Sequence, residues 1–364
     1  MAFFSGFSSR SAAITLGLLG LGFLGGLVAS FLSLPMPWMI GALLSSGLIV
    51  LVKMPPVLTD YAFPTPVRTV FVGLIGVMVG TQVTPELMSL ASQLPLTLGL
   101  LLVYILCAFA VNMAIFQYLG RYDRATALFA SAPGGLIESV LLGEAAGARI
   151  EILVVQQFLR VIVVIIWVPL GLSLWMGHPV GSAAGQSLDQ AGQPNTLADI
   201  VVILTIALVG MWGATKLRLP AAPLTGPLLI TAALNLSGLT SIHLPFWLVA
   251  AAQMVIGVSL GLRFKGVDRH LLKNALWLSH VSVATMLALT VLFAALLNTL
   301  TGIGFIPLFV SYAPGGLAEM AVIALSLAAS PALVSLHHVA RIIMTIITMP
   351  ILARVLGLSD GSKT

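Results

Sequence analysis

Long apolar segments dominate this chain and leave few residues for a water-soluble surface. Hydropathy marks twelve such segments in the 364 residues, and most of them are about 20 residues long, the length at which a helix crosses the hydrocarbon layer of a membrane. Charged residues make up only 7% of the chain, against about 25% in soluble domains. The sequence therefore predicts an all-α polytopic membrane protein. The segments cover residues 12–32, 34–52, 66–88, 96–119, 125–147, 152–176, 197–214, 219–236, 244–262, 275–297, 302–329 and 331–353.

The second half of the chain repeats the first half by residue as well as by hydropathy. The sequence Ala-Pro-Gly-Gly-Leu-x-Glu occurs at 132–138 and again at 313–319, and an arginine follows each copy at the same distance. These matches share one offset of 181 residues, and they include proline, glutamate and arginine, which chance similarity between apolar segments does not explain. We therefore expect a membrane repeat 1 (1–176), an external linker (177–196) rich in Gly, Ser, Gln and Pro, and a membrane repeat 2 (197–364).

One apolar segment in each repeat is expected to break near its centre. Pro133 removes a backbone donor and the two glycines after it permit left-handed turns, and Pro314 stands in the same context. Each side of the break is long enough for only half a membrane. If both broken segments re-enter, each repeat has about five transmembrane helices. All Lys and Arg except Arg160 and Arg341 then lie on one side, as the positive-inside rule requires. The odd number of crossings predicts inverted repeats, with both termini cytoplasmic.

The two breaks also define the candidate site. A half-helix that begins at such a break directs free amide N–H groups and a partial positive charge into a buried site, so an anionic solute is the expected ligand. Glutamate and arginine within the membrane are costly and are expected to be paired or functional. We expect Glu138 and Glu319 to couple an ion, although a structural Glu/Arg pair in each repeat remains an equal alternative, and the breaks themselves could be simple kinks. The expected substrate-binding residues are Ser131, Pro133, Gly134, Gly135, Arg160, Tyr312, Pro314, Gly315, Gly316 and Arg341.

A second feature of the repeats is an asymmetry: Gln156-Gln157 in repeat 1 becomes His337-His338 in repeat 2. This could separate substrate binding from coupling, although such residues more often form hydrogen bonds between helices.

Several classes of function are excluded or disfavoured. Cys107 is the only cysteine, so a disulfide within the chain and a thiolate metal cluster are excluded. The basic residues are scattered, which argues against nucleic acid, and no catalytic or phosphate-binding motif is found. We expect no enzyme activity, catalytic residue, cofactor or metal. The expected partners are the lipid bilayer and a small-molecule or ion substrate, with a homodimer left open.

The duplicated Ala-Pro-Gly-Gly-Leu-x-Glu unit carries a family resemblance, together with the opening Leu-Pro-x-Pro-Trp-Met-x-Gly at 34–41 and its partner at 219–226. Over almost its whole length the chain resembles the AbrB family of duplicated bacterial inner-membrane proteins. Members are labelled regulators of aidB expression or putative ammonia monooxygenases, and the family is similar to cation/proton antiporters and anion transporters. The resemblance implies an ion-coupled secondary transporter in the bacterial inner membrane; the alternative is a membrane-embedded regulator of gene expression without transport.

Overall fold

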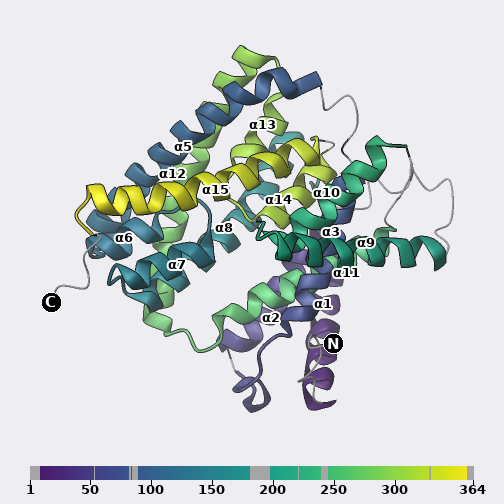
Figure 1. The fold of residues 1–364 in the computed structure, drawn as a ribbon. Coiled ribbons are helices and arrows are strands. Elements are labelled where there is room, and N and C mark those ends of the chain that lie inside the picture. The colour runs from purple at the N-terminus through teal and green to yellow at the C-terminus, as the bar shows by residue number, and fades with distance from the viewer. Residues whose placement is uncertain are drawn as a thin grey trace. The chain divides into compact units, whose positions relative to one another are not determined.

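The computed structural model describes residues 9–52, 54–81, 83, 89–180, 197–219, 221–238, 245–327 and 329–358. Throughout these residues the regular structure is helical, and no strand is present (Figure 1). The α-helices are α1 (Ser9–Phe31), α2 (Pro37–Val52), α3 (Thr65–Thr81), α5 (Leu94–Ala114), α6 (Arg124–Ala130), α7 (Leu136–Ala145), α8 (Ile150–Met176), α9 (Leu197–Lys216), α10 (Ala222–Leu236), α11 (Phe246–Gly261), α12 (Arg269–Thr301), α13 (Phe305–Tyr312), α14 (Leu317–Ser326) and α15 (Pro331–Val355).

The lengths and apolar composition of the helices confirm a polytopic membrane protein. Among the described residues, 7 helices are long and apolar enough to cross a bilayer. Three predicted crossings are shorter, with 16 residues in α2, 17 in α3 and 15 in α10. For α2 the reason is local, because Pro37 occupies the first turn and Met36 has a φ of 47°, so the helix starts three residues later than hydropathy predicts.

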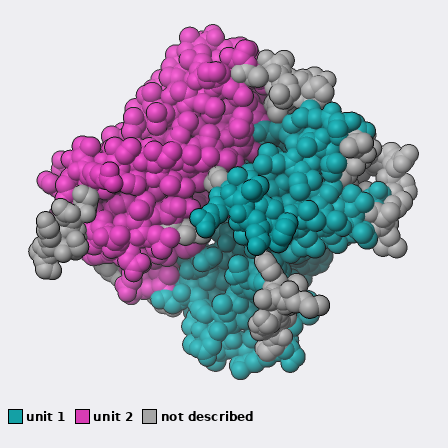
Figure 2. Space-filling view, in the orientation of Figure 1, with its two compact units in different colours: residues 1–85, 168–266, 321–332 teal, residues 86–167, 267–320, 333–364 magenta. Residues whose placement is uncertain are grey.

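The chain forms two compact units, each assembled from segments of both halves (Figure 2). Unit 1 contains residues 1–85, 168–266 and 321–332, and unit 2 contains residues 86–167, 267–320 and 333–364. The predicted sequence repeats therefore differ from the compact units. Most of the predicted linker, residues 181–196, lies outside the described part of the chain.

Helices of unit 1 cross with their backbones in contact. A Cβ atom added to Gly41 of α2 would overlap with the carbonyl oxygen of Gly25 in α1, and one added to Gly226 of α10 would overlap with that of Gly210 in α9. Such crossings are typical of membrane helices, which associate through small residues. Helices that match by sequence thus make matching contacts. The contact of α1 with α2 corresponds to that of α9 with α10, and the contact of α2 with α11 corresponds to that of α10 with α3.

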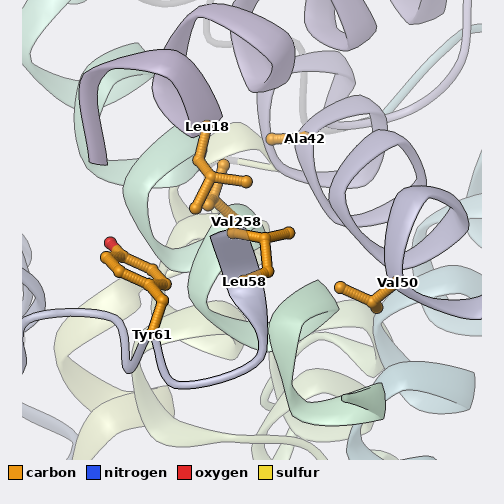
Figure 3. Packing of buried hydrophobic residues seen from close by; sticks show 6 residues of the cluster. All are labelled: Leu18, Ala42, Val50, Leu58, Tyr61 and Val258. Carbon is orange, nitrogen blue, oxygen red and sulfur yellow. The ribbon is translucent and has the colours of Figure 1, made fainter. Parts of the chain in front are cut away.

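A cluster of buried side chains joins α1, α2 and α11 with the segment that follows α2 (Figure 3). Its members are Leu18, Ala42, Val50, Leu58, Tyr61 and Val258. The Tyr61 hydroxyl lies 2.8 Å from the hydroxyl of Thr15, and Lys265 donates to the Tyr61 carbonyl at 2.7 Å. These polar contacts hold the segment against the helices.

Unit 2 contains both predicted helix breaks. Residues 131–135 separate α6 from α7, and residues 313–316 separate α13 from α14. The long helices α5 and α12 run side by side in this unit, α5 also contacts α6, and α12 contacts α13 (Figure 1). Helices α6 and α13 have 7 and 8 residues, about 11 Å and 12 Å at a rise of 1.5 Å per residue, which is less than half of a bilayer core.

Candidate functional site

The first break is a sharp turn that requires glycine. Helix α6 ends at Ala130, and α7 starts after Gly135, whose φ of 65° is left-handed. Pro133 and Gly134 between them are buried. A side chain at position 135 would be strained, because only glycine adopts this conformation without cost.

The second break is built differently although its sequence is nearly the same. Ala313 is extended with a ψ of 138°, the Gly315 N–H donates to the Ala313 carbonyl at 2.8 Å, and neither glycine has a positive φ. Space is tight here, because a Cβ on Gly315 would displace the Met320 side chain and one on Gly316 would displace the Glu319 carboxylate. Both breaks thus leave carbonyl oxygens without an intrahelical donor.

Arg341 is bonded to the second break and lies close to the first. Its guanidinium donates to the Ala313 carbonyl and, through Nη2, to the Gly315 carbonyl at 2.6 Å. Its Nε lies 3.8 Å from the position that a Cβ of Gly134 would take. The break of repeat 1 therefore lies near the arginine that binds the break of repeat 2, within unit 2.

Arg160 occupies the matching position in α8 and makes the matching contact, because it donates to the Ala132 carbonyl. The residues three positions before the two arginines, Gln157 and His338, also make matching contacts. Gln157 donates to the Phe129 carbonyl at 2.8 Å, and His338 lies 3.0 Å from the equivalent carbonyl of Val310. Each arginine thus supplies donors to carbonyls that its own break exposes.

The two arginines also lie near each other. Their guanidinium groups are close enough to act on each other electrostatically, and both act on the Tyr104 phenol in α5. Arg160 is 5% exposed and Arg341 is 1% exposed, and neither forms an ion pair with a carboxylate in the described part of the chain. Because neither buried cation is ion-paired with a carboxylate, the two guanidinium groups are the candidate ligands for an anion.

The two glutamates lie at the N-termini of their own half-helices. Oε2 of Glu138 is 3.3 Å from the position that a Cβ of Gly135 would take, and the carboxylate of Glu319 lies still closer to Gly316. Each carboxylate thus faces the positive end of its helix, where an anionic side chain is stabilised. The structural Glu/Arg ion pair, which the sequence left as an equal alternative to ion coupling, is not formed between Glu138 and Arg160.

The predicted hydroxyl ligands are already engaged. The Ser131 hydroxyl donates to the Leu128 carbonyl at 2.6 Å, and the Tyr312 hydroxyl donates to the Thr97 carbonyl. The Tyr312 ring also packs edge to face on Tyr104, with 5.5 Å between ring centroids. Each hydroxyl oxygen can therefore only accept a hydrogen bond from a solute unless its present bond breaks.

Sequence reasoning missed a polar stripe on α15. Ser335, His338, Arg341 and Thr345 follow at intervals of three, three and four residues, so they lie on one face of the helix, and all are buried. Several of their atoms have no hydrogen-bond partner among the described residues, namely the Ser335 hydroxyl, Arg341 Nε and Thr345 Oγ1. Thr345 Oγ1 and Arg341 Nε both face Gly134. Buried polar groups are normally satisfied, so this face is suited to a polar solute or water.

A cavity of about 450 Å³ lies elsewhere in unit 2 and includes none of the predicted site residues. Its lining includes Arg121, Tyr122, Arg149, Asn274 and Trp277, from the ends of helices rather than from the breaks. No group of three or more His, Cys, Asp or Glu among the described residues could hold a metal ion.

Comparison with known proteins gives one family and two relatives. The family profile described as "Transition state regulatory protein AbrB" matches residues 38–357. "Uncharacterized protein YhjN" of Bacillus subtilis (strain 168) is 26% identical over 361 residues, covering 93% of this chain and 92% of the relative. "Putative regulator AbrB" of Escherichia coli (strain K12) is 29% identical over 285 residues, covering 77% of this chain and 80% of the relative.

Proposed function

We propose that this chain, which belongs to the AbrB family of membrane proteins, is a secondary transporter of a small anionic solute in the bacterial inner membrane. In this proposal the repeats are inverted, both termini are cytoplasmic, and the solute binds where the two breaks meet. The position of Arg341 carries the proposal, because its guanidinium binds one break, lies close to the other, and has no carboxylate partner among the described residues. Broken helices that meet in this way are typical of secondary transporters.

Charge explains why the solute should be anionic and why its transport should be coupled to an ion. Arg160, Arg341, Glu138 and Glu319 are formally neutral together, and the glutamates already occupy the positive ends of the half-helices. A bound anion would add an uncompensated buried charge, which is costly unless a cation enters with it. Protonation of a glutamate would supply that charge and would free a half-helix N-terminus for the solute. We therefore assign ion coupling to the glutamates and assign no enzymatic step.

The direct test begins with binding. Purified protein is screened by thermal unfolding against monocarboxylates, dicarboxylates, amino acids and inorganic anions, since a ligand at 100 times its Kd stabilises the native state by about 2.7 kcal/mol. Uptake of the best binder is then measured in liposomes that contain the protein, with and without a pH gradient across the membrane. We expect uptake that the gradient accelerates.

The matched variants are Arg341→Lys and Arg354→Lys, two substitutions on the same helix. Lysine keeps the charge and loses the planar fork that can hold two acceptors, so Arg341→Lys should weaken binding at least tenfold. Arg354 is exposed and should tolerate the change. Equal effects of the two substitutions would contradict the assignment of Arg341.

The alternative function, a membrane-embedded regulator without transport, is favoured by names alone, those of the family profile and of the E. coli relative. A solute that stabilises the protein but never crosses the liposome membrane would support this alternative and contradict transport.

A further inference from the structure

His337, in the second repeat, is a buried titratable group whose hydrogen bonding is incomplete. The ring is fully buried, and Nδ1 lies 2.9 Å from the Leu333 carbonyl oxygen one turn earlier on α15. Because a carbonyl only accepts, Nδ1 carries the hydrogen. Nε2 has no partner among the described residues, so it presents a free lone pair. His337 can therefore take up a proton without breaking an existing hydrogen bond.

The adjacent His338 is held in the opposite tautomer. Its Nε2 lies 3.0 Å from the Val310 carbonyl oxygen and must carry the hydrogen. Its Nδ1 lies 2.7 Å from Nη2 of Arg341, which can only donate, so Nδ1 is the acceptor. A second proton on His338 would place two donors against each other beside a cation. His338 is thus fixed as a neutral ring that orients Arg341.

Repeat 1 shows what replaces His337 when no titratable group is present. Gln156 stands at the equivalent position, where its Oε1 accepts from the Tyr122 hydroxyl at 3.2 Å and its Nε2 donates to the Ser279 hydroxyl at 2.6 Å. The amide is satisfied at both ends. The two repeats agree at the following position, where Gln157 and His338 donate to equivalent carbonyls. At the position of Gln156 and His337 they differ, because repeat 2 has a free imidazole nitrogen there.

The surroundings of His337 link its proton to the charge of the anion site. His338 and Arg341 lie on its own helix, and the ring of Tyr312 on α13 lies beside it. Beyond these, Tyr104 on α5 packs on Tyr312, Arg160 on α8 interacts electrostatically with Arg341, and Glu319 lies on α14. The Tyr312 ring lies 6.0 Å from the His337 ring between centroids, and Glu319 lies against Gly316 of its own half-helix. A proton on His337 therefore joins two buried cations, and an anion at Arg341 would offset it.

We propose that His337 is a proton-binding site of the second repeat and that it takes up its proton together with the anion bound at Arg341. This rests on the proposed function. The step is a proton transfer from hydronium in the bulk solution to the Nε2 lone pair: one O–H bond of hydronium breaks, one N–H bond forms, water is left, and neutral imidazole becomes imidazolium. The imidazolium adds one positive charge, which offsets one negative charge of the anion in addition to the charge that a protonated glutamate offsets. Anion and proton would thus move in the same direction.

The first test needs no solute. Protein with isotope-labelled histidine is followed by NMR from pH 8 to pH 5, and the signals are assigned from His337→Gln and His338→Gln. Both substitutions copy repeat 1, and His338→Gln keeps a donor for the Val310 carbonyl. We expect His337 to carry its hydrogen on Nδ1 and His338 to carry its hydrogen on Nε2, and His337 to be protonated before His338 as the pH falls. Reversed tautomers, or protonation of His338 before His337, would overturn the proposal.

The second test measures the link to Arg341. Replacing the cation by Arg341→Gln should raise the pH at which His337 is half protonated by at least one unit relative to Arg341→Lys, which keeps the charge. Equal midpoints would overturn the link. If Arg341→Gln does not fold, the proton-to-solute ratio in liposomes decides, because His337→Gln should transport about one proton fewer per anion. Failure of all transport with a titrating His337 would contradict the proposed function alone, whereas transport with an unchanged proton ratio in His337→Gln would contradict this inference alone.

Discussion

Glu138→Gln distinguishes a helix-end carboxylate from a buried ion pair. The Glu138 carboxylate lies against Gly135 at the start of α7, and Arg160 donates to the Ala132 carbonyl instead of to this carboxylate. The substitution therefore removes a negative charge from a helix N-terminus, a contribution of about 0.3–1 kcal/mol. Breaking a buried ion pair would cost about 3–5 kcal/mol. Because Glu138 is half-buried, we expect a loss near the upper end of the first range, about 1 kcal/mol.

The assay is unfolding of the purified protein in detergent, by heat and by denaturant. A loss of about 1 kcal/mol corresponds to a fall in Tm of about 2–4 °C for a unit of 150–250 residues. Arg160→Gln completes a double-mutant cycle, in which the coupling free energy of Glu138 and Arg160 should be below about 0.5 kcal/mol. A loss above 3 kcal/mol that the second substitution restores would show an ion pair and refute the reasoning.

Three further predictions address other parts of the molecule. Asp123→Asn keeps an oxygen that can cap α6 but removes the negative charge at the start of this helix and beside Arg149, so it should lower stability by about 0.3–1 kcal/mol. Burial alone raises the pKa of Asp123, but hydrogen bonds from Thr126 and the Arg149 charge outweigh it and lower that pKa. The wild-type advantage should therefore be present at neutral pH and fade as the pH falls through the lowered pKa, which acid unfolding of both proteins measures. Gly25→Ala should unfold the α1–α2 crossing or lower Tm by several degrees, whereas Gly20→Ala on the same helix meets no atom within 4 Å and should be neutral or stabilising; equal melting temperatures would contradict the crossing. In a Cys107-free variant, a cysteine in the 181–196 segment should react with an impermeant thiol reagent from outside and a cysteine at Gly266 should not, and the opposite labelling would overturn the inverted topology.

Local chemistry made the helix breaks predictable, and tertiary contacts made the rest of the site unpredictable. Proline followed by two glycines predicted both breaks, and both are observed. The position of Glu138 could also have been predicted, because a glutamate three residues after the N-cap is a common helix-start signal. Arg341 lies close to Gly134, which is 207 positions earlier in the chain. This proximity depends on how α15 packs, and no local sequence pattern predicts it.

The interpretation of His337 and His338 illustrates the same limit. Their sequence indicates only two adjacent imidazoles that face different sides of a helix. Their hydrogen-bond partners decide that one ring orients an arginine and the other keeps a free nitrogen. The polar spacing of Ser335, His338, Arg341 and Thr345, in contrast, is visible in the sequence and would have drawn attention to this face of α15.

The glycine crossings of unit 1 have a consequence for its motions. Where the Gly25 carbonyl meets Gly41, and the Gly210 carbonyl meets Gly226, backbone lies directly against backbone, and the nearest side chains are the small ones of Ser45 and Ala214. Most packed helices adjust to one another when rotamers at their interface change, and slides of an ångström or two are absorbed in this way. Here such small side chains leave little to adjust, so a slide would drive peptide groups into each other. The α1–α2 and α9–α10 pairs should therefore each behave as a single rod, and the amide hydrogens at their crossings should be among the slowest in the protein to exchange with deuterium.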